Sequence, residues 1–289
     1  MAIFSLGSKK DKKTAEPQYV KSAINNTVLN YNVYTMTAVE WIFYTVAAIV
    51  VGGAVGLVFY GGLFKDGGGL ATTATFISNI VVFCLVGLIA AKLFIPMRTE
   101  QLKEKRKKKL CLQARDMLES LSASLSSGQV MQTAFESAYN DLRLQYGPDA
   151  FIVAELNEIL QGMNHNIPAE ELLRDFGTRS GNEDILNFSD VFAVCLRRGG
   201  DLKEVVRRTY SVISDKMAIS DEIETKLTSN KTQQKFMNGM PVVLVAVLRL
   251  TNESFAINFA TPTGVLSITV ALAIFYGAYR YGEKIVDIK

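Results

Sequence analysis

Residues 110–128, LCLQARDMLESLSASLSSG, open a run of amphipathic helices around which the rest of the chain is organised. Apolar residues recur there at steps of three and four, the spacing of one helix face: Leu110, Ala114, Met117, Leu118, Leu121 and Leu125. Gly128 suits the left-handed position that follows a helix C-terminus. Because the same spacing continues to Phe236, we predict a helical block between Leu110 and Phe236.

Five more helices are expected in this block. Their apolar faces begin near Val130, Phe151, Pro168, Asn182 and Leu202. Asn182 can cap the fifth helix of the block, which should end at Arg197-Arg198-Gly199-Gly200, where cations precede glycine. Asp201 and Glu204 then have the spacing of an aspartate variant of the capping box. We expect the sixth helix to run from Leu202 to the membrane near Phe236 as a rigid link.

Long apolar segments precede the block. Trp41–Phe64 contains no charged residue and at 1.5 Å per residue covers about 36 Å, which is enough to cross a bilayer. Lys65–Gly69 is expected to be a turn, and Leu70–Pro96 returns across the membrane. Gly52 and Gly56 form a GxxxG pair, which either allows another helix to approach closely or reflects the general frequency of glycine in membrane helices.

The apolar segments after the block are less regular. Pro241–Leu248 is apolar, but Arg249 follows, and an arginine at mid-bilayer costs about 2.5–3.5 kcal/mol on insertion scales. We therefore expect either a short span that ends near Leu250 or one arm of a re-entrant hairpin. Thr261-Pro262-Thr263-Gly264 is a turn, and Val265–Tyr281 is the expected last span. Four crossings with both termini inside are predicted, with three as the alternative.

The expected fold is therefore all-α. It combines an N-terminal membrane hairpin, one cytosolic antiparallel bundle of about six helices, and a C-terminal membrane hairpin. A short helix is expected around Val20–Leu29. The segments are a cytosolic tail at 1–37, two spans at 38–97, the bundle at 98–238, the C-terminal pair at 239–284, and a tail at 285–289.

Positive charge is concentrated directly after the second apolar segment, although the net charge is only +3. The run comprises Lys105, Arg106, Lys107, Lys108 and Lys109. No aromatic residues interleave with it, which argues against nucleic-acid binding and leaves a solvated helix start or a lipid-facing anchor. The anchor is favoured because basic residues flank spans on the cytosolic side, each gaining about 1 kcal/mol near anionic lipid.

The sequence contains no motif for catalysis, and we predict no enzyme activity, no cofactor and no metal. Neither a GxxxxGK[ST] loop nor an HExxH or GxSxG motif occurs. His165 is expected in a polar linker, and the acidic residues near Glu170 and Glu183 are more typical of helix starts than of a cation site. The three cysteines are far apart and are expected to stay reduced: Cys84, Cys111 and Cys195.

Two parts of the block resemble the type II secretion F domain family. One is Leu121–Ala134, LSASLSSGQVMQTA, and the other is Phe188–Arg198 followed by Gly199-Gly200-Asp201-Leu202-Lys203-Glu204-Val205. The order of two spans, one F domain and a C-terminal hairpin is similar to the TadB-type platform proteins of tight-adherence (Flp) pili. Platform proteins of type II secretion typically carry two F domains in tandem, whereas this chain has one.

The resemblance implies a platform in the cytoplasmic (inner) membrane that couples a separate cytosolic hexameric ATPase to pilin assembly and protein export. The implied partners are that ATPase, pilin subunits, membrane lipid, and a second F domain from the same protein or a TadC-like paralogue, but no nucleic acid. The motif residues are Gly128, Ala134, Gly199, Gly200, Asp201, Glu204 and Pro241. The alternatives are a permease subunit of an ATP-driven transporter and a membrane-anchored adaptor or sensor.

Overall fold

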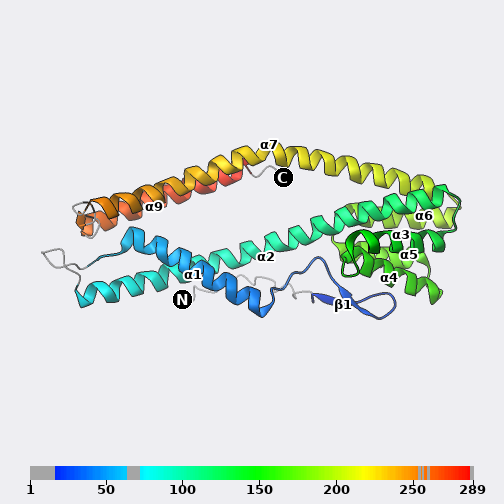
Figure 1. The fold of residues 1–289 in the computed structure, drawn as a ribbon, viewed down its shortest axis with the longest axis horizontal. Coiled ribbons are helices and arrows are strands. Elements are labelled where there is room, and N and C mark those ends of the chain that lie inside the picture. Colours follow the sequence, from blue (N-terminus) through cyan, green and yellow to red (C-terminus); the bar gives the residue numbers. More distant parts are fainter. Residues whose placement is uncertain (1–16, 64–71, 253–254, 256, 259–260, 287–289) are drawn as a thin grey trace, which may run out of the picture. The chain divides into compact units, whose positions relative to one another are not determined.

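The computed structural model describes residues 17–63, 72–252, 255, 257–258 and 261–286 (Figure 1). These residues are mostly helical, which confirms the helical class. Their contacts form two compact units, unit 1 with residues up to Thr35 and Glu100–Ser214, and unit 2 with Met36–Thr99 and the chain from Asp215 onward. The helices are α1 Ala38–Tyr60, α2 Thr73–Ser126, α3 Met131–Tyr146, α4 Phe151–Asn164, α5 Ala169–Ser180, α6 Glu183–Arg198, α7 Leu202–Thr251 and α9 Pro262–Val286.

The N-terminal segment of unit 1 forms a β-hairpin, so the helix expected around Val20–Leu29 is wrong. Strand β1, Tyr19–Lys21, pairs antiparallel with β2, Thr27–Leu29. Asn25 in the connecting turn has a φ of 69°, a left-handed conformation that ends any helix. The β-branched residues on either side of the turn then favour strands. The hairpin belongs to unit 1, a grouping that the sequence did not indicate.

Helix α2 is longer than expected and has no break at the junction between apolar and basic sequence. It runs through Pro96 and the basic run as one helix of 54 residues. Proline removes one backbone hydrogen bond from a helix but does not always end it. The part of α2 after Glu100 contributes fully buried Leu110, Leu118 and Leu121 to the core of unit 1, as their spacing predicts.

Helix α7 confirms the prediction of a long sixth helix and is longer than expected. It begins at Leu202, passes the expected end near Phe236, and continues through Pro241 to Thr251, over 50 residues. At 1.5 Å per residue this is about 75 Å of continuous helix. The apolar sequence from Pro241 onward is therefore an extension of α7 rather than a separate element.

The core of unit 1 lies among α3 to α6 and the adjoining parts of α2 and α7. The starts of these four helices follow the periodic pattern within one residue of the expected positions. The largest fully buried side chains of the four include Phe135, Leu142, Ile152, Leu156, Leu173, Phe176 and Phe192. Each such side chain contributes about 1.5–3 kcal/mol through removal from water. The rings of Phe188 and Phe192 on α6 have centroids 5.5 Å apart and are tilted by 54°.

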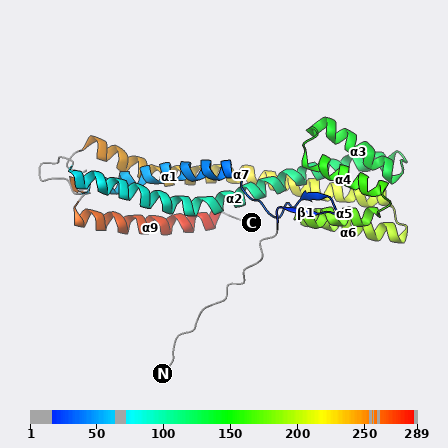
Figure 2. The ribbon, with the colours of Figure 1, turned by 90° about the horizontal axis from the view of Figure 1, so that it is seen from below.

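Unit 2 contains the helices that are long and apolar enough to cross a membrane. Among the described residues these are α1 and the first part of α2, while α9 has a shorter apolar stretch, Pro262–Ala278. Figures 1 and 2 show α1 beside the first part of α2. A Cβ atom on Gly52 would overlap that of Ala90, and one on Gly56 would lie 2.9 Å from Val86. The GxxxG pair therefore lies at the α1–α2 contact. The expected turn at Lys65–Gly69 lies outside the described residues.

Candidate functional site

The turn between α6 and α7 has the geometry that its sequence predicts. Gly199 has a φ of 68°, the left-handed value that follows a helix end. The Gly200 N–H donates to the Cys195 carbonyl at 2.9 Å, which is the long bond of a Schellman motif. The Asp201 carboxylate then accepts from the backbone N–H groups of Lys203 at 3.0 Å and Glu204 at 3.4 Å. Asp201 therefore caps α7.

Of the two side-chain contacts of the expected capping box, the structure has the one in which the Asp201 carboxylate accepts backbone N–H groups. The Glu204 carboxylate accepts from the Arg207 guanidinium at 2.7 Å, within α7. This pair is exposed and contributes less than about 1 kcal/mol. The direction in which α7 leaves the turn therefore depends mainly on Gly199 and Asp201.

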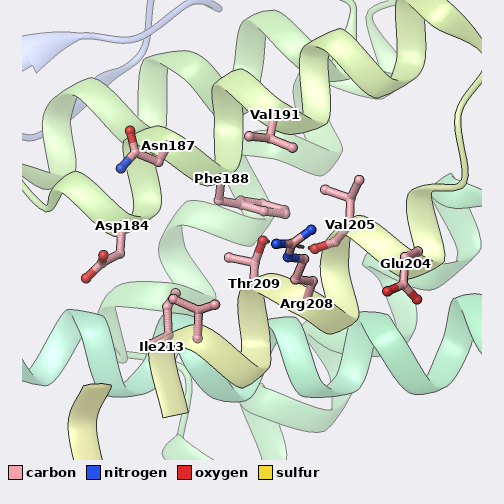
Figure 3. Close-up of a pocket in the computed structure, with 10 residues that line it drawn as sticks. Asp184, Asn187, Phe188, Val191, Glu204, Val205, Arg208, Thr209 and Ile213 are labelled. Carbon is pink, nitrogen blue, oxygen red and sulfur yellow. Dashed lines mark hydrogen bonds between the residues drawn. The ribbon is translucent and has the colours of Figure 1, made fainter. Parts of the chain in front are cut away.

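A groove of about 380 Å³ lies between α6 and the start of α7 (Figure 3). Phe188 and Ile213 are fully buried beneath it, whereas Val191 and Val212 are about half exposed at its edge. Its polar lining includes side chains of both charge signs, Asp184, Glu204 and Arg208.

Substitutions at Gly199 test whether the turn sets the geometry of α7. Gly199→Val is expected to cost about 1–2 kcal/mol, because a β-branched residue is strained at positive φ. Gly199→Asn is the matched control, because asparagine tolerates this conformation and no atom lies within 4 Å of a Cβ built there. Thermal unfolding of the purified chain measures the difference. Equal stability of the two variants would contradict this role.

The other predicted motif residues are structural. Gly128 has a φ of 86° at the end of α2, as expected. Ala134 is fully buried on α3. Pro241 lies inside α7 and does not begin a new helix.

The basic run divides into two sets. Arg106 stacks on the Tyr34 ring at 4.3 Å, and the Lys107 ammonium donates to the Asn32 side chain at 3.1 Å and the Gly181 carbonyl at 3.2 Å. These two cations therefore hold the segment after the β-hairpin against the helices of unit 1. The remaining three are exposed: Lys105, Lys108 and Lys109, the last with its ammonium 5.6 Å from the centroid of the Phe151 ring.

A buried ionic network joins the N-terminal segment to the helices of unit 1, and sequence reasoning missed it. Arg179 on α5 forms a bidentate pair with Glu155 on α4, at 2.7 and 2.8 Å. Only 6% and 4% of the two side chains are exposed. The same guanidinium donates to the Leu29 carbonyl at 3.2 Å and to Asp175 at 2.8 Å, and the Tyr31 hydroxyl donates to Glu155 at 3.0 Å.

Burial is the largest single influence on the pKa of Tyr31, Glu155 and Arg179. Burial and the Glu155 carboxylate raise the pKa of Tyr31, so its hydroxyl keeps its proton and donates. Burial lowers the pKa of Arg179, but the two carboxylates outweigh it and the net direction is upward. Burial raises the pKa of Glu155 against the opposing hydrogen bonds from Arg179 and Tyr31. Arginine does not release its proton, and both Glu155 oxygens accept hydrogen bonds from the guanidinium, so the pair is ionised.

A second contact ties the hairpin itself to α4. Glu158 accepts hydrogen bonds from the Ser22 hydroxyl and, at 3.0 Å, from the Asn26 amide. Both donors flank the turn of the hairpin. The hairpin is therefore held at its turn, and the chain after it is held by the Arg179 network.

Unit 2 has a polar junction where α1 ends. The Arg249 guanidinium on α7 donates to the carbonyls of Val58 at 2.7 Å, Leu57 at 3.0 Å and Gly61. The Asn79 side chain on α2 accepts from the Gly62 N–H at 2.8 Å. On α9, the Thr269 hydroxyl lies 3.1 Å from that of Tyr60, completing the junction.

The acidic residues, the histidine and the cysteines considered above lie apart from one another. Among the described residues, no group of three or more His, Cys, Asp or Glu side chains could hold a metal ion. Cys84, Cys111 and Cys195 form no disulfide. Glu170 pairs with Arg197 at 3.2 Å, in the first turn of α5, and His165 follows the end of α4.

Comparisons with known family models, curated proteins and solved structures give no match. The likeness of the two motif segments to the F domain family therefore stays a prediction, and the functional argument depends on the contacts described above.

Proposed function

We propose that this chain is a multi-pass platform protein of the cytoplasmic membrane that couples a separate cytosolic ATPase to the assembly of a pilus or a secretion pseudopilus. In this proposal unit 1 lies in the cytosol and unit 2 lies in the membrane. The observation that carries the proposal is the continuity of α7. This helix follows the Gly199-Gly200-Asp201 turn and runs without a break through the apolar sequence after Pro241 to Thr251. A movement of the turn would therefore reach the membrane through a single helix.

The charge distribution supports the proposed orientation. Lys105, Lys108 and Lys109 are exposed on α2 directly after its apolar part. Basic residues beside a span favour the cytosolic side. The chain carries one helical block of the F domain type, and we propose that the second block of a complete platform comes from another copy or from a TadC-like paralogue.

Gly200→Val tests the coupling. A Cβ at Gly200 would lie 2.8 Å from the Cys195 sulfur, so valine must displace the Cys195 side chain in the last turn of α6. We expect the variant to insert into the membrane at the normal level but to assemble no pili or pseudopili. Electron microscopy of the cell surface and membrane fractionation measure the two outcomes.

Cys195→Ala provides the matched control for that experiment. It removes the sulfur that the new side chain would contact, so the double variant Gly200→Val with Cys195→Ala should recover part of the assembly. Normal assembly by Gly200→Val alone would refute the role of the turn in coupling.

Affinity purification of the whole chain from its native membrane separates the candidate functions. A platform should bring down both a P-loop ATPase and small pilins. A permease subunit should bring down an ATPase without pilins, and an adaptor or sensor should bring down neither.

A further inference from the structure

An apolar groove of about 550 Å³ lies between α1 and α2 within unit 2. Its walls include the Tyr44 and Phe94 rings, whose centroids are 6.5 Å apart. Ala47 and Ala48 form part of its lining, and Arg98 lies at one end. We propose that this groove binds one anionic phospholipid, with an acyl chain along the apolar lining and the phosphate at Arg98.

The dimensions of the groove favour a lipid chain over a protein helix. It extends along α1 from Phe43 to Gly52, which is about 14 Å at 1.5 Å per residue. A bilayer core is about 30 Å thick, so the groove covers less than one leaflet. It closes near Gly52 and Ala90, where the two helices touch. A transmembrane partner helix would need a surface that continues past this contact.

The charges favour an anionic headgroup. Arg98 is half-buried, and its guanidinium lies 5.2 Å from the centroid of the Tyr44 ring, which holds it at the end of the groove. A planar guanidinium can offer parallel donors to phosphate oxygens. Among the described residues that line the groove there is no carboxylate, so a choline or ethanolamine group would find no acidic partner there. Glu100, close by on α2, is paired with Lys103 at 2.6 Å.

The site goes beyond the proposed function, because it requires unit 2 to lie in a membrane but requires neither an ATPase nor pilins. The purified full chain is placed in nanodiscs that contain equal parts of phosphatidylcholine and phosphatidylglycerol. It is then released into mild detergent, and the retained lipid is counted by native mass spectrometry. We expect one phosphatidylglycerol per chain. Equal retention of the two lipids, or a co-purified peptide in the groove, would overturn the proposal.

Two variants with matched controls locate the site. Arg98→Gln should lower the preference for phosphatidylglycerol about tenfold, the loss expected for a hydrogen bond to a charged group. Lys92→Gln removes an exposed cation of the same helix that does not line the groove and should leave the preference unchanged. Ala47→Trp should fill the groove and remove retained lipid of both kinds, whereas Val46→Trp, on an exposed position outside the groove, should not. Unchanged retention in Arg98→Gln and Ala47→Trp would refute the site.

Discussion

Replacing Arg179 with methionine is expected to lower the free energy of unfolding of unit 1 by about 3–5 kcal/mol. Methionine fills much of the same space but leaves the Glu155 carboxylate, 4% exposed, without its bidentate partner. A buried charge that loses its partner bears its full desolvation cost. Thermal unfolding of the purified chain in detergent, with hydrogen exchange in α4 and α5, measures the loss.

The double variant Arg179→Met with Glu155→Met distinguishes a charge effect from a packing effect. Replacing both members of a buried ion pair by apolar residues is often neutral or stabilising, so the double variant should recover most of the loss. Glu204→Gln, which breaks an exposed pair with Arg207, should change stability by less than about 1 kcal/mol. A loss below 1 kcal/mol for Arg179→Met would show that the network does not stabilise unit 1.

The same variant should loosen the N-terminal segment at Leu29, whereas the backbone hydrogen bond from Tyr31 to residue 179 stays. Arg179 holds this segment through its guanidinium, which donates to the Leu29 carbonyl, and through its own carbonyl, which accepts the Tyr31 N–H at 3.0 Å. The chain after Tyr31 leads within a few residues to α1. Together with α2 and α7, the segment gives unit 1 a third covalent connection to unit 2, and Arg179 is one of the residues that hold it.

Local signals explain what the sequence predicts well. The start of α6 depends on Asn182, whose side chain accepts from Asp184 N–H and Ile185 N–H, and its end depends on Gly199. Each of these signals acts within four residues, so it can be recognised in the sequence without knowing which other element packs against the helix. The apolar spacing of α3 to α6 likewise reports a buried face directly, because burial against any neighbour requires it.

The features that the sequence did not predict depend largely on contacts between residues that are distant in the sequence. The hairpin is docked by Glu158, which lies 136 residues from Ser22, and no local pattern announces this pair. Arg106 and Lys107 belong to a basic run that favours a lipid anchor, but their contacts are with Tyr34 and Asn32. The helix continuity at Pro96 and Pro241 was also missed, because one lost hydrogen bond per proline is outweighed by the turns on either side.

Replacing Arg249 with leucine should destabilise unit 2, although leucine is far more favourable in an apolar span. From the sequence, Arg249 has an expected cost of about 2.5–3.5 kcal/mol at mid-bilayer, which predicts either a short span that ends near Leu250 or one arm of a re-entrant hairpin. In the structure its guanidinium donates to the carbonyls of Val58 and Gly61, and also to that of Leu57, which already accepts the Gly61 N–H at 2.9 Å. Hydrogen bonds to a charged group contribute about 1.5–3 kcal/mol each, so their loss outweighs the gain in hydropathy.

Arg249→Lys is the matched control, because it keeps the charge but replaces the planar fork by a single ammonium group. We expect thermal stability in detergent to fall in the order wild type, lysine variant, leucine variant, with faster hydrogen exchange at the end of α1 in the leucine variant. A leucine variant at least as stable as wild type would contradict the junction. The number of membrane crossings is a separate prediction, and we expect four. A cysteine at Thr261, in a chain without its native cysteines, should then react with an impermeant maleimide from outside the cell.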